Sequence, residues 1–335
     1  MKKVLITSID KDKGSGGNKA KDDIKYFLNK KLNFKNFDMA IDGASKAYKY
    51  YFVNTKLRSF IKEEKPDVLF FQYPNITFYV MNKMVSIYRK YVPNGKIYFI
   101  IHDIMGWQFA HREEILNLEL DLFNRTDGLV VHNESMEKFL REKGINVQMS
   151  QLGVFDYRNE KPFAKTINDK TICFPGNLGK SKFLQKMKTK LTVNLYGPNQ
   201  ASKYPEKLHY CGNFPSDKIP GILKESFGLI WDGESINTCS GSLGEYLRIN
   251  DPHKASLYIS TGIPVVTWNN AALAHLIEKY GIGITVRSLS ELDSKIVNIT
   301  DKEYQSMKEK TENLGEKVKA GYFIVNAVSN LLSNS

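Results

Sequence analysis

Residues 227–267 read FGLIWDGESINTCSGSLGEYLRINDPHKASLYISTGIPVVT. The stretch opens with a short apolar run, Phe227–Trp231, and closes with another, Pro264–Thr267. Between them, Asn-Asp-Pro-His-Lys is typical of a helix start, with Asp251 as the expected N-cap and Pro252 at the first helical position. Gly262 is typical of a helix end. A strand, a helix and a second strand in this order predict two parallel strands joined by a crossover helix.

The same alternation runs through the rest of the chain. Short β-branched or aromatic runs predict strands at Lys3–Thr7, Asp67–Gln72, Lys96–Ile101, Gly128–Val131, Thr171–Phe174, Leu191–Tyr196 and Gly283–Val286. Amphipathic patterns predict helices at Ala44–Glu64, Ile76–Tyr91, Ser135–Lys143 and Val318–Leu332. The sequence therefore predicts an α/β protein with parallel sheets that helices cover on both faces.

Length and composition fit two such domains. The chain has 335 residues, 42% apolar and 25% charged, as in a soluble globular protein with a sizeable core. Residues 156–170 are polar, lack periodicity and contain a proline, so we expect a linker there, between a domain of residues 1–155 and one that begins at residue 171. The chain shows neither the apolar stretch of a signal peptide nor a run of 18 apolar residues. We therefore expect a cytoplasmic protein whose membrane contact is at most peripheral.

Net charge and the spacing of cysteines and histidines indicate which partners the protein binds and which it does not. The formal net charge of +12 favours an anionic partner, such as nucleic acid, an anionic membrane or a phosphorylated substrate. Three cysteines without C-x-x-C spacing, and six histidines without H-x-x-x-H spacing, argue against a zinc site. The sequence has no RNP, helix-turn-helix or zinc motif, so we expect no nucleic-acid partner.

Lys254 falls in the first turn of the helix that Pro252 starts. A cation there opposes the helix macrodipole. It becomes favourable when an anion lies between the lysine and the free N–H groups of the turn. We therefore predict an anion site at Lys254; the alternative is an ordinary exposed lysine.

Two glycine-containing turns follow neighbouring strands of the second half. Gly176-Asn-Leu-Gly-Lys180 follows the strand at Thr171–Phe174 and is expected to open a helix, so its N–H groups and Lys180 could meet a diphosphate. The alternative is a simple strand–helix turn. At the end of the next strand, Tyr196 and Gly197 could offer an aromatic ring and exposed backbone to a nucleobase. Taken alone, these two residues are more typical of a structural role than of a binding site.

His102 and Asp103 end a very apolar strand of the first half. A carboxylate at that rim is a candidate general base for a sugar hydroxyl. His102 is the alternative base, or orients the carboxylate, and a structural hydrogen-bonded Asp103 is a further alternative. His132 and Asn133 end the following strand and are expected at the same edge.

The first strand is followed by Gly14-Ser-Gly-Gly-Asn-Lys19. Gly16, Gly17, Asn18 and Lys19 would let an anion approach the backbone before a helix, or form a plain surface loop. The segment is neither a dinucleotide-binding G-x-G-x-x-G nor a P-loop, which argues against an NAD enzyme. Asp10-Lys-Asp12 is more typical of a solvated loop than of a metal site.

With these segments in view, the chain resembles bacterial β-galactofuranosyltransferases of the O-antigen and capsule type. The likeness is densest at 228–235 (GLIWDGES) and 237–265 (NTCSGSLGEYLRINDPHKASLYISTGIPV), with support from PGNLGKSK (175–182), IIHDI (100–104) and VKAGYF (318–323). It is more distantly similar to the glucosyltransferase that elongates N-acetylglucosamine on serine-rich-repeat adhesins. The likeness is close in the second half and patchy in the first.

The resemblance implies a GT-B architecture: two Rossmann-like domains with a cleft between them, the nucleotide held by the second (171–316), and a C-terminal helix (317–335) returning to the first. It implies inverting, metal-independent transfer from a UDP-sugar, with no cofactor. Leu257 stands where the large retaining GT-B family has a glutamate, which also argues against a retaining mechanism. Carried over by position, the diphosphate ligands are Gly176, Asn177, Lys180, Lys254 and Ser256. The nucleotide or sugar pocket is lined by Tyr196, Gly197, Asp232, Glu234, Thr238 and Ser240, with Asp103 as the base.

The expected reaction is galactofuranosyl transfer from UDP-galactofuranose to a sugar hydroxyl of a lipid-linked glycan. The alternatives are a UDP-glucose-dependent enzyme acting on a glycosylated adhesin, and a non-catalytic nucleotide-sugar-binding partner of another transferase. Relatives suggest self-association. The expected docking to an anionic membrane rests on Lys46, Lys49, Lys56, Lys83 and Lys90, for which the alternative is an ordinary lysine-rich surface.

Overall fold

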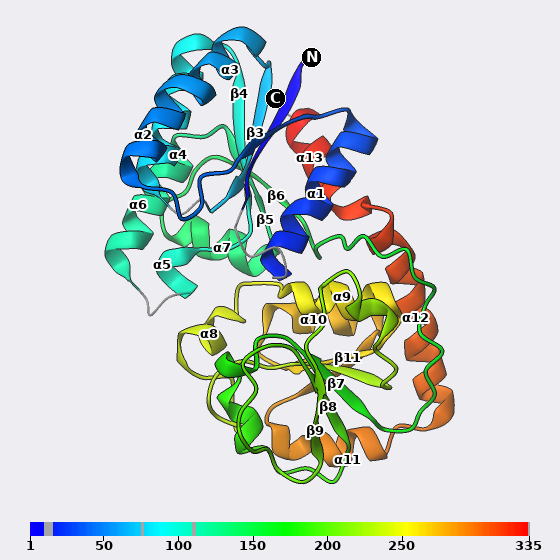
Figure 1. Ribbon diagram of the computed structural model, residues 1–335. Helices are drawn as coiled ribbons and strands as arrows, with labels where there is room; N and C mark the ends of the chain where they lie inside the picture. The colour runs from blue at the N-terminus through cyan, green and yellow to red at the C-terminus, as the bar shows by residue number, and fades with distance from the viewer. Residues whose placement is uncertain (10–15, 75–76, 109–111, 334–335) are drawn as a thin grey trace. The chain divides into compact units, whose positions relative to one another are not determined.

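The computed structural model describes residues 1–9, 16–74, 77–108 and 112–333. The chain divides into two compact units (Figure 1): Met1–Leu152 with Phe323–Ser335, and Gly153–Tyr322. Each unit contains one six-stranded sheet in which every pair of neighbouring strands is parallel. The expected α/β class with two Rossmann-like domains is confirmed.

The sheet of the N-terminal unit has the strand order β2-β1-β3-β4-β5-β6. Its strands are β1 (Lys3–Ser8), β2 (Lys35–Met39), β3 (Val68–Tyr73), β4 (Lys96–Ile101), β5 (Gly128–Val131) and β6 (Gln148–Gln151). Every residue of β3 and β5 is buried, because parallel strands are covered by helices on both faces. The helices are α1 (Gly16–Leu32), α2 (Lys46–Phe52), α3 (Arg58–Glu64), α4 (Phe78–Tyr91), α5 (Met105–Gln108), α6 (Glu113–Asn124), α7 (Glu134–Glu142) and α13 (Tyr322–Ser333).

The sheet of the C-terminal unit has the order β12-β11-β10-β7-β8-β9. Its strands are β7 (Ile172–Pro175), β8 (Val193–Tyr196), β9 (Leu208–Gly212), β10 (Phe227–Ile230), β11 (Val265–Trp268) and β12 (Gly283–Val286). Its helices are α8 (Gly241–Tyr246), α9 (His253–Thr261), α10 (Ala272–Tyr280), α11 (Leu292–Val297) and α12 (Asp301–Lys319). Helix α9 packs close to β10, because Gly228 leaves room for the ring of Tyr258: a Cβ at Gly228 would lie 2.4 Å from it.

Three strands that the sequence pattern did not predict, β2, β6 and β9, all lie at sheet edges. Their burial is incomplete; β9, for example, exposes three consecutive residues. An edge strand is half-covered and carries polar residues, so the apolar signal on which strand prediction depends is weak there.

Two expected helices are divided. The stretch Ala44–Glu64 forms α2, a π-helical turn η1 (Val53–Leu57) and α3. The expected helix Val318–Leu332 spans a break, because α12 ends at Lys319 and Gly321 adopts a positive φ of 77° before α13 begins. A capping box between Thr300 and Glu303 starts α12.

Residues between β6 and β7 form neither strand nor helix. This segment is attached to the C-terminal unit by buried hydrogen bonds. The amide of Asn159 donates to the Ser260 carbonyl (2.9 Å), and Lys308 donates to the Ala164 carbonyl (2.8 Å).

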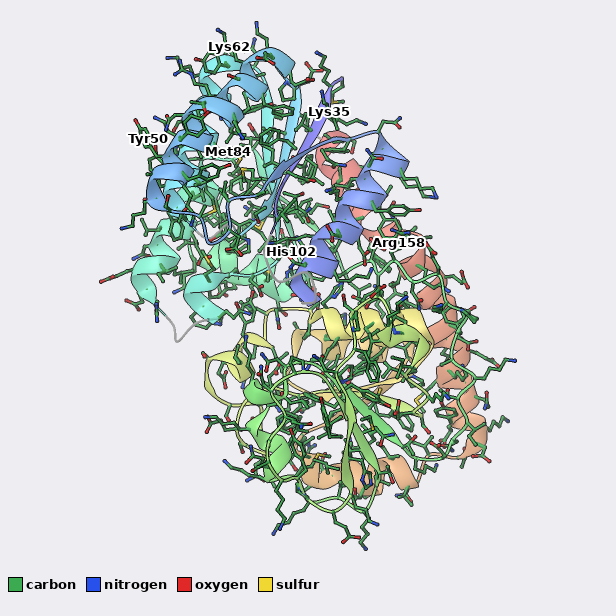
Figure 2. The ribbon with its side chains drawn as sticks, viewed as in Figure 1. Lys35, Tyr50, Lys62, Met84, His102 and Arg158 are labelled. Atoms are coloured by element: carbon green, nitrogen blue, oxygen red, sulfur yellow. The ribbon has the colours of Figure 1, made fainter. Side chains whose placement is uncertain are left out.

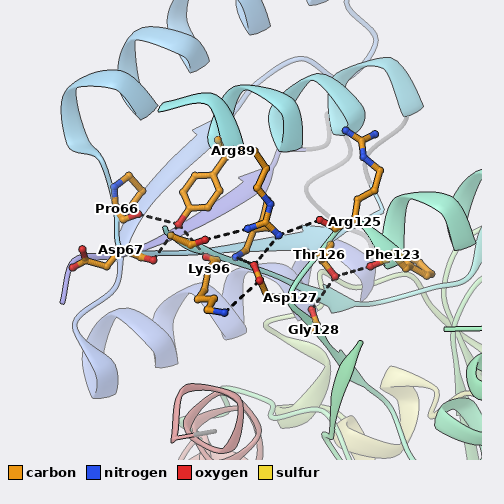
Figure 3. Close-up of polar contacts among 12 residues, drawn as sticks. Pro66, Asp67, Arg89, Lys96, Phe123, Arg125, Thr126, Asp127 and Gly128 are labelled. Atoms are coloured by element: carbon orange, nitrogen blue, oxygen red, sulfur yellow. Dashed lines mark hydrogen bonds and ion pairs between the residues drawn. The ribbon is translucent and has the colours of Figure 1, made fainter. Parts of the chain in front are cut away.

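The charged groups at the amino edge of the N-terminal sheet are paired with one another (Figure 3). Asp127, before β5, forms ion pairs with Arg89 (2.8 Å) and Lys96 (3.6 Å) and accepts from the amide of Ile97 (2.7 Å). The Tyr88 hydroxyl donates to carbonyls at the starts of β3 and β4: those of Pro66 and Asp67, just before β3, and that of Lys96, the first residue of β4. These contacts fix the starts of the strands. In an open parallel sheet, ligands bind at the opposite, carboxyl edge, where the loops gather.

Candidate active site

The carboxyl ends of β7 and β8 touch through backbone. A Cβ at Gly197 would lie 1.9 Å from the Gly176 carbonyl oxygen, and the two glycines have φ of 135° and 151°. Only glycine fits this crossing, since a side chain would collide with the neighbouring loop. The turn at Gly176 is thereby left open on the side of Lys254, whose Nζ lies 3.5 Å from the position a Cβ would take.

Lys254 is the second residue of α9, and it lies beside the end of β7. Its Nζ is 4.0 Å from the centroid of the Phe174 ring. Among the residues that the structure describes, this ammonium has no hydrogen-bond or ion-pair partner. A partly buried cation that lies over a ring face and beside glycine backbone keeps Lys254 as the candidate anion-binding residue.

Asp232, which follows β10, is the carboxylate whose charge acts most strongly on Lys254. Burial lowers the pKa of Lys254, and the Asp232 carboxylate opposes that shift. Burial likewise raises the pKa of Asp232, against the charges of Lys254 and Lys180. Each group is thus disfavoured in its charged form, and an anion held beside Lys254 would favour the protonated lysine.

The start of α9 differs from the sequence prediction. The N-cap is Pro252, with an extended ψ of 136°, and the helix begins at His253, so the prediction of Asp251 as the N-cap was wrong. Proline has no side-chain acceptor, so it leaves the first amides of the helix to other partners. One turn further on, Ser256 is fully buried, and its Oγ has no hydrogen-bond partner within the described ranges. This orphaned hydroxyl keeps Ser256 as a candidate ligand-binding residue in the first half of α9.

The turn Gly176–Lys180 does not open an α-helix; it forms one 3₁₀ turn, Leu178–Lys180, and then another, Lys182–Gln185. Most of its amides are already engaged. Gly176 N–H donates to the Tyr196 carbonyl (2.8 Å), Leu178 N–H to the Pro198 carbonyl (3.0 Å), and Gly179 N–H to Asn177 Oδ1 (3.1 Å). The expected cradle of backbone amides is therefore largely internal to the turn, and the exposed Lys180 side chain is what it can offer to an anion.

The remaining predicted pocket residues lie in two groups. Glu234 forms an exposed ion pair with Lys182 (2.6 Å), and the lysine lowers the pKa of that carboxyl. Thr238 is exposed, while Ser240 is the N-cap of α8. Tyr196 is buried, and its hydroxyl donates to Glu225 Oε1 (2.5 Å). The structure thus brings Gly176, Asp232 and Lys254 together, whereas Glu234 and Tyr196 already have protein partners.

In the N-terminal unit, His102 and Asp103 follow β4 (Figure 2). His102 is 9% exposed, and its Nε2 lies 2.9 Å from Gln72 Oε1. Asp103 is only partly buried, and its Oδ1 accepts from the Gln108 amide (3.1 Å). His132 directly follows β5 and is buried, which lowers its pKa to about 4, so it stays neutral near pH 7. Asn133 caps α7 through Met136 N–H (3.0 Å).

Glu119 of α6 is a fully buried carboxyl that the sequence pattern did not reveal. It accepts from the Met105 amide (2.7 Å), the Gly106 amide (2.7 Å) and the Tyr73 hydroxyl (2.5 Å). Burial raises the pKa of Glu119, and these three bonds oppose the shift. The carboxyl thereby holds the backbone two residues beyond Asp103. The sequence did not reveal this role, because Glu119 lies in the segment EEILNLEL, where its position is typical of a surface acid on an amphipathic helix.

The N-terminal glycine segment is helical where the structure describes it. Gly16, Gly17, Asn18 and Lys19 form the first turn of α1, not a loop, and Lys19 pairs with Asp23. A Cβ at Gly17 would meet no described atom within 4 Å, so no close approach demands glycine there. Asp10, Asp12 and Gly14 lie outside the described residues.

Family comparisons agree with this two-unit architecture. The N-terminal domain of the family described as glucosyltransferase 3-like matches residues 3–154, and the C-terminal domain of the same family matches residues 172–331. The chain belongs to the glucosyltransferase 3-like family.

Curated relatives of this glucosyltransferase 3-like chain include the enzymes that the sequence resembles. Beta-1,6-galactofuranosyltransferase WbbI of Escherichia coli K12 is 29% identical over 283 residues, 81% of each chain. Glucosyltransferase 3 of Streptococcus gordonii is 25% identical over 245 residues, 71% of this chain and 72% of that one. The resemblance predicted from sequence is confirmed, and the chain is a glycosyltransferase.

Solved structures show the fold. The apo lipopolysaccharide outer core galactosyltransferase WaaB aligns with a TM-score of 0.62 at 11% identity, covering 99% of both chains. A trehalose-phosphate synthase from Burkholderia vietnamiensis aligns with a TM-score of 0.63 at 9% identity, also over 99% of both. The glucosyltransferase 3-like chain therefore has the expected GT-B fold. No helix within the described ranges is long and apolar enough to span a bilayer.

Proposed function

We propose that this glycosyltransferase moves a galactofuranosyl residue from UDP-galactofuranose to a sugar hydroxyl of a lipid-linked glycan, with inversion and without a metal or other cofactor. The observation that carries the proposal is the ammonium of Lys254 beside Gly176, which forms no hydrogen bond or ion pair with any described residue. The donor sugar rests on the match to the galactofuranosyltransferase WbbI over 81% of this chain.

The donor end of the reaction lies on the C-terminal unit. Departure of UDP places negative charge on its β-phosphate, and Lys254 with Lys180 would stabilise that charge. Ser256 Oγ and the first amides of α9 would add hydrogen bonds. Fixed charges in a partly desolvated site stabilise a leaving group without reorganising, and removing one such contact costs about 2–4 kcal/mol, roughly 30- to 1000-fold in rate.

The acceptor end rests on Asp103. Its carboxylate takes the proton of the acceptor hydroxyl while the hydroxyl oxygen bonds to the anomeric carbon and the bond from that carbon to the phosphate oxygen breaks. Asp103 is partly exposed, and its Oδ1 accepts from the Gln108 side-chain amide (3.1 Å), so the carboxylate is held at the end of β4 while part of it remains open to a substrate. His102 is the second candidate for this proton.

A UDP-glucose-dependent activity on a glycosylated adhesin is the alternative, and the two streptococcal proteins named glucosyltransferase 3 favour it. A donor panel separates the two: hydrolysis and transfer are measured with UDP-galactofuranose, UDP-galactopyranose and UDP-glucose. The proposal expects release of UDP from UDP-galactofuranose at the highest kcat/KM. Faster turnover of UDP-glucose would replace it with the alternative. If no donor turns over while UDP still binds, the remaining reading is a non-catalytic nucleotide-sugar-binding partner.

We further propose weak docking of the N-terminal unit to an anionic membrane. The sequence from Ala44 to Lys62 and helix α4 contain no acidic residue. Four tyrosines on α2 and α4 are 40–61% exposed, with Tyr50 at the outer surface of α2 (Figure 2) and stacked on Tyr79 at 6.0 Å: Tyr48, Tyr50, Tyr51 and Tyr79. Lysine and exposed tyrosine together suit a lipid headgroup layer.

Sedimentation with vesicles tests this docking. Binding to phosphatidylglycerol vesicles, absent with phosphatidylcholine and lost at high salt, is the expected result. It should weaken in Lys46→Glu/Lys49→Glu and persist in Lys203→Glu/Lys207→Glu on the C-terminal unit. If both double variants lost binding equally, binding would depend on the overall charge of the protein, and the proposed docking surface on the N-terminal unit would be contradicted.

A further inference from the structure

Three neighbouring strands of the N-terminal sheet carry a buried polar chain at their carboxyl ends. Thr7 lies on β1, Gln72 on β3 and His102 just beyond β4. The Gln72 side chain is fully buried; its Nε2 lies 2.7 Å from Thr7 Oγ1 and 3.0 Å from the Lys21 carbonyl oxygen, and its Oε1 lies 2.9 Å from His102 Nε2.

The chemistry of these partners fixes the orientation of the Gln72 amide. A backbone carbonyl only accepts hydrogen bonds, so the side-chain group facing Lys21 O must be the NH₂ donor. The carbonyl oxygen of Gln72 then faces His102, and that oxygen also only accepts. His102 Nε2 must therefore carry the hydrogen, which defines the neutral ring as the Nε2–H tautomer.

The backbone reinforces this placement. The amide of His102 donates to the carbonyl of Tyr73 (2.8 Å), the residue after Gln72. Main chain and ring of His102 are thus both held by consecutive residues of β3. With the ring turned this way, Nδ1 is the nitrogen that can gain a proton.

We propose that Gln72 is a positioning residue for glycosyl transfer: it holds His102 as the Nε2–H tautomer, so that only Nδ1 can accept a hydrogen bond or a proton. This inference rests on the proposed function, in which the His102–Asp103 pair serves the acceptor. The proton that leaves the acceptor hydroxyl ends on Asp103 or on Nδ1. In either case the Nε2–H bond to Gln72 persists, because an amide oxygen does not take up the proton.

Gln72→Met keeps the length of the side chain but removes both the acceptor and the donor. Gln72→Glu keeps an acceptor for Nε2–H and loses the donor to Lys21 O. Thr126→Val is the matched control in the same unit, because it removes a buried hydrogen bond to the Phe123 carbonyl (2.7 Å) at the opposite sheet edge (Figure 3).

The experiment reads the His102 tautomer by two-bond ¹H–¹⁵N NMR on histidine-labelled protein, without substrate, at a pH where the ring is neutral. Wild type, Gln72→Glu and Thr126→Val should show Nε2–H, and Gln72→Met a tautomer mixture. In transfer assays Gln72→Met should lose about 10- to 100-fold in kcat with donor KM within about twofold, and Gln72→Glu should recover part of it.

Several results would overturn the proposal. An Nδ1–H tautomer in wild type contradicts the assignment directly, and this result does not depend on any activity. A lost tautomer preference in Gln72→Met with unchanged kcat contradicts the positioning role. If Gln72→Met does not fold, the wild-type and Gln72→Glu spectra still decide the tautomer. If no UDP-sugar turns over, the proposed function is wrong. The tautomer assignment is then still decided by the NMR spectra, which need no activity.

Discussion

The Nζ of Lys254 lies 4.0 Å from the centre of the Phe174 ring. The lysine comes from the first turn of α9 and the ring from β7, so the cation is placed where the helix start meets the carboxyl edge of the sheet. A cation over a ring face is attracted by the ring's quadrupole, but a ring is a weaker partner than an anion. An anion such as a diphosphate would therefore be a stronger partner for this ammonium than the ring is.

Lys254→Ala is expected to weaken UDP binding by about 1.5–3 kcal/mol, roughly 10- to 150-fold in Kd, since one hydrogen bond to a charged group is lost. Isothermal titration calorimetry with UDP measures the change. Lys224→Ala, an exposed lysine on the same unit, should bind like wild type. Equal affinity in the Lys254 variant and wild type would remove Lys254 from the donor site.

The lowered pKa of Lys254 predicts a pH-dependent affinity for UDP. Burial favours the neutral amine, so the ammonium loses its proton below the ordinary lysine value of 10.5. Affinity should therefore begin to fall at a lower pH than it would with an ordinary lysine, because only the charged form attracts the diphosphate. Lys254→Arg keeps its charge across this range and should flatten the dependence. Parallel pH profiles for the two proteins would contradict this cause.

Asp103→Asn is expected to abolish transfer and to leave UDP affinity unchanged, because the amide cannot take the acceptor proton and lies outside the donor site. Single-turnover transfer and UDP calorimetry on one preparation supply both readings. Turnover close to wild type would place the base elsewhere, with His102 as the next residue to test.

His132 predicts a loss of stability in mild acid. Its pKa of about 4 in the folded protein lies below the unfolded value of 6.5, so between these two pH values only the unfolded chain binds the proton. The free energy of unfolding should fall by about 3 kcal/mol as pH drops through that window. Urea unfolding at several pH values, compared with His132→Gln, measures it. An identical pH slope in the variant would show that other groups cause the loss.

Glu119→Gln is expected to destabilise the N-terminal unit by about 1–3 kcal/mol, since an amide cannot accept from Tyr73 and from both backbone amides as the carboxylate does. Chemical unfolding measures the change. Glu113→Gln, exposed on the same helix, is the control and should unfold like wild type. A Glu119 variant as stable as this control would show that Met105 and Gly106 find other partners.

The alternation of apolar and amphipathic runs was enough to predict the central strands, because buried parallel strands are nearly continuous apolar segments. Edge strands such as β2 and β9 lacked that signal. The sequence singled out Lys254 because a cation in a first helical turn conflicts with the macrodipole, and its role as a phosphate ligand stays a prediction.

Gln72 and Glu119 were not predictable in the same way. Each is a buried polar residue whose partners lie more than ten residues away in sequence, and periodicity carries no information about such partners. Asp251 shows a different limit of sequence prediction. Its side chain is of a type that often caps helices, yet the N-cap of α9 is the next residue, Pro252. The difference is a single residue at a helix boundary, where sequence preference is least informative.

A crystal structure with bound UDP tests the central claim most directly. The account predicts the β-phosphate within hydrogen-bond distance of Lys254 Nζ, with Ser256 Oγ or the first amides of α9 as further donors. Nucleotide density remote from Lys254, or binding in solution that leaves Lys254 without a phosphate contact in the crystal, would contradict it.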